Sequence, residues 1–334
     1  MSDTVAVWRV YSPRWLMSDY IKRWLVVAIV VLFDVIALPS ADIHANWQAA
    51  LPQFELAVVV MAYAVAFSQF GRFSKKLPTV ARFGEVVSDF GFSVVQLMTF
   101  VTFLVPLTYV LARTDFPLID DQLRSVDSLL GFDWSSMRSW VVSHPAVHAL
   151  LQFSYFSAAL QPLALFAIGS VLEPGKRTGE LIWLMIVSPL ICCVVFALIP
   201  SYAMGGEVSS YVSMLHSLRA DGPLAIDFSR LIGIIQFPSF HASAGVIYIY
   251  AARHRLWTLL PFAALNTAMI AATPPIGGHY LTDTIGGIGV ALVTIAAIRR
   301  LHPASPSASD SRLALPPAAV VSTDTTRSDA NRAR

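Results

Sequence analysis

Long apolar runs separated by short polar joints dominate the first 300 residues. Runs of about 18 or more apolar residues are typical of transmembrane helices, because backbone polar groups in lipid must be hydrogen-bonded within their own segment. The pattern predicts an all-α polytopic bundle of about eight spans. These spans are placed at residues 22–40, 52–71, 90–112, 146–170, 180–200, 237–252, 257–273 and 279–298. The sixth and seventh are short for a bilayer, so a six-span arrangement with re-entrant segments is the alternative.

Basic residues are distributed unevenly around these spans. If the N-terminus is cytoplasmic and the sides alternate, only five of the 23 Lys and Arg residues fall in outer loops, which leaves 18 on the cytoplasmic side. The five are Arg113, Arg124, Arg138, Arg219 and Arg230. Cytoplasmic segments of membrane proteins carry an excess of Lys and Arg. We therefore expect both termini to be cytoplasmic.

Composition supports a membrane protein and argues against other classes. Hydrophobic residues make up 56% of the 334 residues and charged residues 13%, compared with roughly 25% charged residues in soluble domains. The net charge of +2 is small and dispersed, so we expect no nucleic-acid partner. Cys192 and Cys193 are adjacent within an apolar run, where free cysteines pack as small hydrophobic side chains.

Three regions follow from these patterns. Residues 1–145 are expected to form accessory spans, and residues 146–300 a catalytic membrane domain. Residues 301–334 are rich in Pro, Ala, Ser and Thr and predict a disordered cytoplasmic tail. The outer loop 113–145 contains five Asp residues and predicts short amphipathic helices on the membrane surface, while the outer loop 201–236 is a candidate lid or substrate guide.

Two polar clusters stand at the outer ends of predicted spans. Residues 238–241 read P-S-F-H, and residues 277–283 read G-G-H-Y-L-T-D. Ionisable residues at membrane depth are costly, so they mark candidate sites. His279 and Asp283 are four apart and share one face of a helix. Asp283 can then keep one imidazole nitrogen protonated while the other acts as a nucleophile.

His241 would begin a second helix on the same side of the membrane. Two neighbouring helix N-termini present unpaired N–H groups and positive dipole ends, which favour an anion such as phosphate. Each cluster alone could be structural: an interfacial histidine, or an H-x-x-x-D pair that forms a structural hydrogen bond. A zinc site is a further alternative, since two His and one Asp can bind that metal. The two clusters together favour a catalytic site without a metal.

At these clusters the sequence resembles the type 2 phosphatidic acid phosphatase superfamily. The resemblance is closest to its inositol phosphorylceramide synthase (aureobasidin-resistance) branch, with sphingomyelin synthases as cousins. Residues 238–241 resemble the second motif of the superfamily in its P-S-F-H form, and residues 278–283 resemble the third motif with its H-x-x-x-D core. The resemblance is specific over roughly residues 200–300 and elsewhere rests on hydropathy.

The resemblance implies a role for each residue of the motifs. His279 would attack phosphorus and form a phosphohistidine, and Asp283 would orient it. His241 would protonate the leaving oxygen and then deprotonate the acceptor. The superfamily implies no organic cofactor or metal, and its site commonly faces away from the cytoplasm. The candidate substrate-binding residues are Ser239, Gly278, Tyr280, Arg219 and Arg230.

The sequence departs from the superfamily in its cationic residues. Ala272 and Thr273 stand where the third motif usually has Ser-Arg, and the first motif, K-x6-R-P, has no match in an outer loop. Developing charge on a phosphoryl group still needs a cation or an equivalent donor. Arg219 and Arg230, in the loop that enters the sixth span, are the candidates, with ordinary solvated loop charges as the alternative.

We therefore expect a membrane enzyme that transfers a phosphorylated, inositol-phosphate-like head group between lipids. The alternatives are a lipid phosphate phosphatase that uses water and a non-catalytic transporter or scaffold. The expected partners are a phospholipid donor and a lipid or polyol acceptor, in a plasma or inner membrane with the site on the non-cytoplasmic face. The sequence does not indicate which donor, acceptor or oligomeric state applies.

Overall fold

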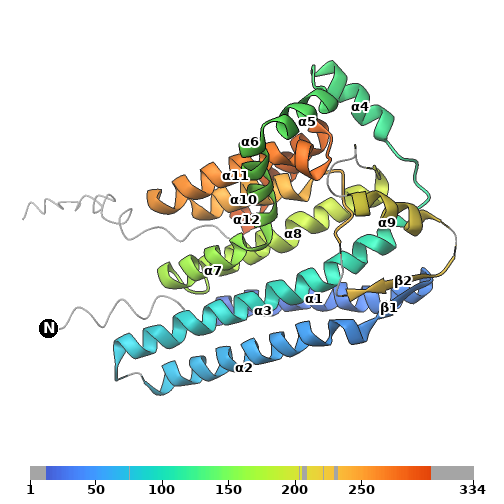
Figure 1. Cartoon of the computed structure of the whole chain (residues 1–334). Helices are drawn as coiled ribbons and strands as arrows, with labels where there is room; N and C mark the ends of the chain where they lie inside the picture. Colours follow the sequence, from blue (N-terminus) through green and yellow to red (C-terminus); the bar gives the residue numbers. More distant parts are fainter. Residues whose placement is uncertain are drawn as a thin grey trace, which may run out of the picture. The chain divides into compact units, whose positions relative to one another are not determined.

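The protein is described here from a computed structural model, which covers residues 13–74, 76–202, 204, 209–220, 222–228 and 232–301. These residues are helical almost throughout, and the prediction of an all-α polytopic bundle is confirmed (Figure 1). The helices are α1 (Pro13–Ser40), η2 (Trp47–Ala50), α2 (Leu51–Phe73), α3 (Pro78–Ala112), α4 (Asp120–Leu129), α5 (Trp134–Ser143), α6 (Pro145–Phe156), η3 (Ser157–Ala159), α7 (Gln161–Leu172), α8 (Arg177–Leu198), α9 (Ser209–Arg219), α10 (Phe240–Ala252), α11 (Leu256–Gly277) and α12 (Leu281–Leu301).

Two short strands also occur in the described residues. β1 (Ile43–Asn46) and β2 (Leu224–Asp227) pair in parallel, with Ile43 opposite Leu224. This pairing ties the segment after α1 to the segment after α9. Sequence patterning did not predict it, because four-residue strands are too short to show a period of two.

Within the described residues, five helices are long and apolar enough to cross a membrane: η2 with α2, α3, α8, α11 and α12. The helices α6 and α7 are bent by 58° at their junction and count as a sixth if they form one span. The predicted span 22–40 falls within α1 (Pro13–Ser40), and the predicted span 237–252 falls on α10, which at 13 residues is a shorter apolar helix. At 1.5 Å per residue α10 is about 20 Å long, compared with a hydrocarbon core of about 30 Å. The predicted span 257–273 was too short, because α11 continues to Gly277.

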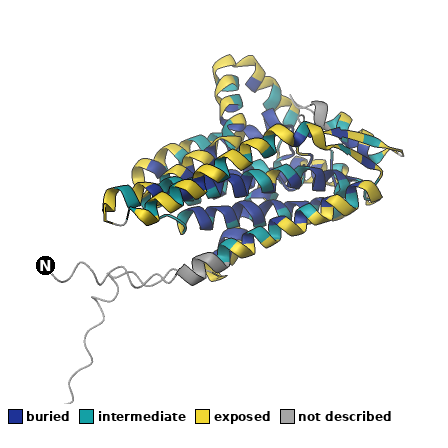
Figure 2. Ribbon diagram, turned by 90° about the horizontal axis from the view of Figure 1, so that it is seen from below, coloured by how far each residue is buried: buried dark blue, intermediate teal, exposed yellow. Residues whose placement is uncertain are grey.

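The bundle buries its central helices and exposes the outer ones. α3 contacts α1, α2, α7 and α8, and α10 packs between α8 and α11. Of the most apolar part of α3, 61% is buried, compared with 11% for α2. Figure 2 shows the same contrast between dark blue central segments and yellow outer faces. A helix whose apolar side chains stay exposed, as α2 does, fits contact with lipid rather than water.

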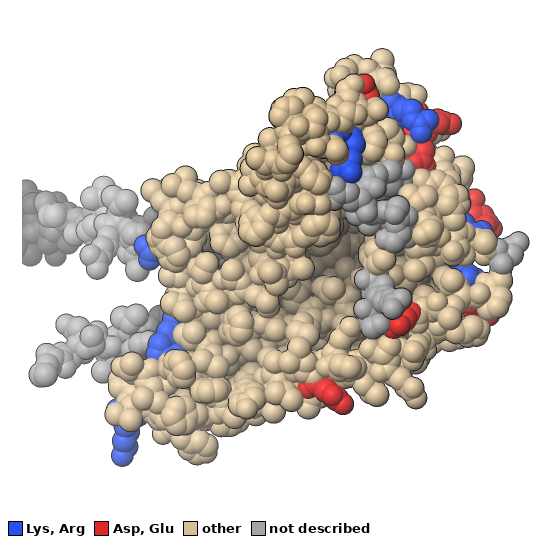
Figure 3. Space-filling model, viewed as in Figure 1, with Lys and Arg blue, Asp and Glu red and all other residues tan. Residues whose placement is uncertain are grey.

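Charged side chains gather at the two ends of the bundle. On the face in Figure 3, Lys and Arg are visible at both ends of the bundle, and Asp and Glu mainly towards the end that carries α4, α9 and the strands. The zone between them is almost free of charge, as expected for a segment in hydrocarbon. The predicted disordered tail falls on residues 302–334, outside the described part of the chain.

Candidate active site

The turn between α11 and α12 carries the third-motif residues. α11 ends at Gly277, and its C-cap Gly278 has a φ of 73°, in the left-handed region that glycine adopts without strain. The Gly278 carbonyl accepts hydrogen bonds from the Gln236 side-chain amide at 3.0 Å and from the Met204 N–H at 2.8 Å. Gly278 therefore shapes the turn. Gln236, which the sequence analysis missed and which lies two residues before the P-S-F-H segment, holds the Gly278 carbonyl in place.

His279 and Asp283 face each other, although His279 lies two residues before α12 and not, as predicted, on the same helix. His279 Nδ1 lies 3.3 Å from Asp283 Oδ2, and the Tyr280 N–H donates to the same oxygen at 3.0 Å. The side chain of His279 is 4% exposed and that of Asp283 is fully buried. This arrangement leaves His279 Nε2 as the nitrogen directed away from the carboxylate.

The P-S-F-H segment packs directly against this pair. Ser239 is the N-cap of α10, and its hydroxyl lies 3.4 Å from the Ala242 N–H and 3.5 Å from His279 Nε2. The Ser239 N–H donates to the Asp283 backbone carbonyl at 3.0 Å. Gly287 on α12 lies against the Ser239 carbonyl, with no room for a Cβ atom. The two motifs, 40 residues apart in sequence, therefore form one site.

His241 lies in the first turn of α10, beside an aromatic ring from α6. Its imidazole stacks on Tyr155 with ring centroids 4.0 Å apart and planes 13° apart. A Cβ atom on Gly277 would meet both the Tyr155 hydroxyl, at 2.6 Å, and the His279 ring, at 2.9 Å. Tyr155 therefore contacts His241 and also lies beside Gly277 at the end of α11. No sequence signal identified it, since a lone Tyr in an apolar helix is usually a core residue.

Two acidic residues of α4 also reach the site and were not among the predicted site residues. Asp127 accepts the N–H groups of Leu281 and Thr282 at 2.8 and 2.9 Å, and Asp120 accepts the Tyr280 hydroxyl at 3.0 Å. Burial and the nearby Asp120 carboxylate raise the pKa of the Tyr280 hydroxyl, so Tyr280 stays protonated and donates this bond. Its hydroxyl thus contacts α4 rather than a vacant substrate position.

Of the two predicted phosphate-binding arginines, the structure describes only Arg219, which donates a hydrogen bond to a backbone carbonyl away from the His pair. Arg219 donates from Nη2 to the Phe116 carbonyl at 2.7 Å, which ties α9 to the segment before α4. Arg230 lies outside the described residues. Among the side chains that the structure describes, no three His, Cys, Asp or Glu residues converge as metal ligands would.

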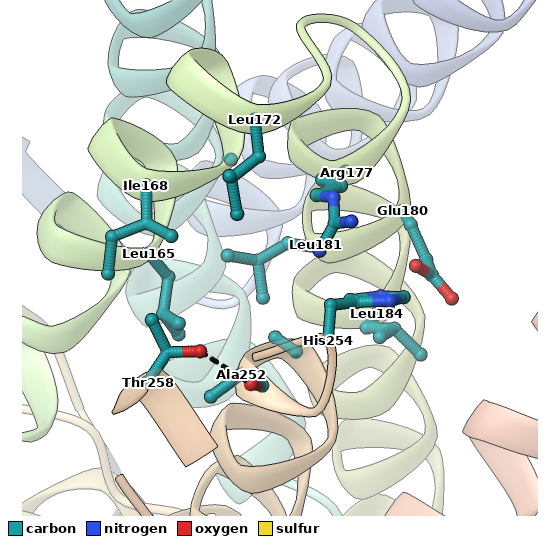
Figure 4. A pocket seen from close by; sticks show the side chains of 12 residues that line it. Leu165, Ile168, Leu172, Arg177, Glu180, Leu181, Leu184, Ala252, His254 and Thr258 are labelled. Carbon is teal, nitrogen blue, oxygen red and sulfur yellow. Dashed lines mark hydrogen bonds between the residues drawn. The ribbon is translucent and has the colours of Figure 1, made fainter. Parts of the chain in front are cut away.

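A small cavity lies away from the His pair, between α7, α8, α10 and the start of α11 (Figure 4). Its lining is mostly apolar and also includes Arg177, Glu180 and His254. Burial, with Arg253 and Arg177 nearby, lowers the pKa of His254 to about 4, so this imidazole is neutral at pH 7. The volume of about 20 Å³ suits one water molecule and no lipid head group.

A family model described as the PAP2 superfamily matches residues 121–297, more than half of the chain. The chain belongs to the PAP2 superfamily. No curated protein and no solved structure matches it. Membership of the PAP2 superfamily supports phosphatase or phosphotransferase chemistry on lipids in general. The matched segment holds both motifs and also α4 from its second residue, α5 and α6, which contribute Asp127 and Tyr155.

Proposed function

We propose that this chain is a membrane phosphotransferase that moves a phosphorylated head group from a donor phospholipid to a hydroxyl acceptor through a phosphohistidine at His279. The observation that carries the proposal is the buried His279–Asp283 pair at 3.3 Å, packed against the Ser239–His241 turn. Asp283 would hold Nδ1 protonated, which leaves Nε2 nucleophilic, as in the triads of hydrolases. The superfamily match supports this reaction class.

The reaction would occur in two balanced steps. In the first, His279 Nε2 forms a bond to phosphorus as the bond from phosphorus to the diacylglycerol oxygen breaks, and His241 gives that oxygen its proton. In the second, His241 removes the proton of the acceptor hydroxyl, whose oxygen attacks phosphorus as the N–P bond breaks. His241 acts as acid and then as base, so the enzyme returns to its starting state. The N–H groups in the first turn of α10, which Ser239 caps, are suited to the phosphoryl oxygens.

The burial of the site favours transfer over hydrolysis. A phosphohistidine open to solvent would meet water at about 55 M, so an alcohol acceptor competes only if water is excluded and the acceptor is held in place. His279 is 3% exposed and Tyr280 is 1% exposed. A lipid acceptor would be concentrated and oriented by the membrane itself. The P-S-F-H form of the second motif supports an inositol-phosphate-like head group.

The charge distribution supports a site on the non-cytoplasmic face. The His pair lies in the turn that precedes α12, and the other end of α12 carries Arg299 and Arg300. If that basic end is cytoplasmic, as the positive-inside rule predicts, the pair faces the opposite side. Donor and acceptor lipids would then come from the outer leaflet.

The proposal predicts that acceptors redirect the product. Purified protein in mixed micelles would be given head-group-labelled phosphatidylinositol, with and without a panel of ceramide, diacylglycerol and polyol acceptors, and the products resolved by mass. We expect a matching acceptor to divert most of the label from free inositol phosphate into a new phosphodiester, because the acceptor outcompetes excluded water. If no acceptor suppresses hydrolysis, the protein is a hydrolase that uses water as its acceptor, and the transferase proposal is wrong. If no lipid phosphate turns over, the enzymatic proposal is wrong.

The role of His241 predicts a dependence on the leaving group. In the His241→Ala variant, release of an alkoxide such as that of diacylglycerol lacks its proton donor, and we expect a fall in kcat of about 10²- to 10⁴-fold. With a p-nitrophenyl phosphodiester the leaving group needs no proton, so the first step should slow far less. The measurement is the pre-steady-state burst of p-nitrophenol against the rate with a lipid donor. Equal losses on both substrates would contradict the general-acid role.

A further inference from the structure

The helix that begins with the catalytic turn lacks an N-cap of its own. α12 starts at Leu281, and the residue before it is Tyr280, whose side chain cannot accept a hydrogen bond from the next N–H groups as Ser, Thr, Asp or Asn would. The first N–H groups of a helix have no intrahelical partner. Here the first such donors are the N–H groups of Leu281 and Thr282, which lie two and three residues after His279, the proposed nucleophile.

Asp127 supplies the missing cap from another part of the chain. One oxygen of its carboxylate accepts the Leu281 N–H at 2.8 Å, and the other accepts the Thr282 N–H at 2.9 Å and the Thr282 hydroxyl at 2.5 Å. Asp127 is 4% exposed, and 155 residues separate it from Thr282. A buried carboxylate with three donors is strongly held, since charge-assisted hydrogen bonds are shorter and stronger than neutral ones.

A second carboxylate of the same helix holds the residue between His279 and Leu281. Asp120, two turns before Asp127 on α4, accepts the Tyr280 hydroxyl at 3.0 Å and the Tyr202 N–H at 2.9 Å. The Tyr280 N–H donates in turn to Asp283. The segment from Tyr280 to Thr282 is therefore fixed on one side by α4 and on the other by the proposed orienting residue.

We infer that Asp127 is a positioning residue for the reaction: α4 serves as a clamp that sets the start of α12 and, through it, the His279–Asp283 geometry. This inference rests on the proposed function for its catalytic part. The physical requirement is strict, because a displacement of about 1 Å at a reacting group can lower a rate about 10²-fold. The outer Asp-rich loop would thus belong to the catalytic machinery rather than to a passive surface.

The same loop offers a matched control. Asp133 caps α5, where it accepts the Ser135 N–H at 3.0 Å and the Ser136 hydroxyl. It is an aspartate N-cap on the neighbouring helix, but α5 carries no residue of the His pair. Although α5 contacts the end of α11 through Trp134 and Arg138, Asp133→Ala should reproduce the loss of a cap without removing a hydrogen bond to Leu281 or Thr282.

The test compares Asp127→Ala, Asp127→Asn and Asp133→Ala in micelles, by steady-state kinetics and by hydrogen exchange of residues 279–287. For Asp127→Ala we expect kcat to fall about 100-fold with KM unchanged, together with faster exchange at Leu281 and Thr282. For Asp127→Asn we expect an intermediate, roughly tenfold fall, because the amide keeps one acceptor oxygen and loses the other. Asp133→Ala should stay within about threefold of the wild type, with unchanged exchange at these two residues.

The outcomes separate the clamp from the proposed function. Equal kinetic losses in Asp127→Ala and Asp133→Ala, or a fall in kcat with unchanged exchange at Leu281 and Thr282, would overturn the clamp. If Asp127→Ala does not fold, the Asp127→Asn variant tests the clamp instead. A wild-type kcat together with wild-type exchange in Asp127→Asn would then overturn the clamp. If the wild-type protein turns over no lipid phosphate, the proposed function fails, and the exchange comparison alone decides whether Asp127 holds the turn.

Discussion

Replacing His279 with alanine should abolish phosphoryl transfer. In the wild type, His279 Nδ1 lies 3.3 Å from Asp283, and the other ring nitrogen is the proposed nucleophile. The alanine variant has no nitrogen at this position that can form the covalent bond to phosphorus. Loss of a member of a hydrolase triad lowers the rate by about 10⁴-fold or more. We expect a loss of at least that size, measured as the rate of labelled head-group transfer and as the disappearance of an acid-labile phosphoenzyme.

The matched control for this change is His144→Ala. His144 is exposed and lies between α5 and α6, where it stacks on Trp140 with ring centroids 4.4 Å apart. This variant should turn over at the wild-type rate. If His279→Ala still transferred the head group at a rate near that of the control, His279 could not be the nucleophile.

The local part of the site could be predicted from the sequence. His279 and Asp283 are four residues apart, and this short separation brings them together at the start of α12, even though the helix itself begins only at Leu281. The Ser239 cap at the start of α10 follows the same local logic, since Ser before a helix caps its first turn. Both relations depend only on neighbours in the chain, and the structure contains both.

The parts that were missed depend on packing between distant segments. Tyr155 meets His241 only because α6 crosses α11, and Asp127 meets Thr282 only because α4 lies over the end of the bundle. No periodicity or spacing encodes these pairs. The acidic loop was recognised as polar surface, yet its buried face is the part that reaches the site.

The end of α11 also depends on contacts with a distant segment, so the local sequence could not predict where this helix stops. The predicted span ended at residue 273, directly before Pro274 and Pro275, and proline in a helix interior removes a hydrogen bond and distorts the chain. The helix instead continues to Gly277. The carbonyls of the two prolines accept hydrogen bonds from α5, from Trp134 at 2.8 Å and Arg138 at 2.6 Å. These partners are more than 130 residues away in sequence, so the local pattern alone predicted an early end.

Close contact between α10 and α12 makes Gly287 the most sensitive position outside the reacting groups. A Cβ atom there would overlap the Ser239 carbonyl and meet the Ala242 Cβ at 3.1 Å. Because the Ser239 N–H is bonded to the Asp283 carbonyl, the backbone cannot move away without separating the two motifs. We therefore expect Gly287→Ala to lower transfer by at least about 100-fold and to destabilise the fold by about 1–3 kcal/mol, as overpacking of a core does.

Gly289, two residues further along α12, provides the control for this prediction. A Cβ atom at Gly289 would meet nothing within 4 Å, and alanine favours a helix over glycine by up to about 1 kcal/mol. Gly289→Ala should therefore keep the wild-type transfer rate and raise, or leave unchanged, the thermal unfolding midpoint in micelles. The two variants add the same methyl group to the same helix, so any difference between them reports the contact with Ser239. Wild-type transfer by Gly287→Ala would show that α10 and α12 need not touch for catalysis, and the site would then have to form in a different arrangement of these helices.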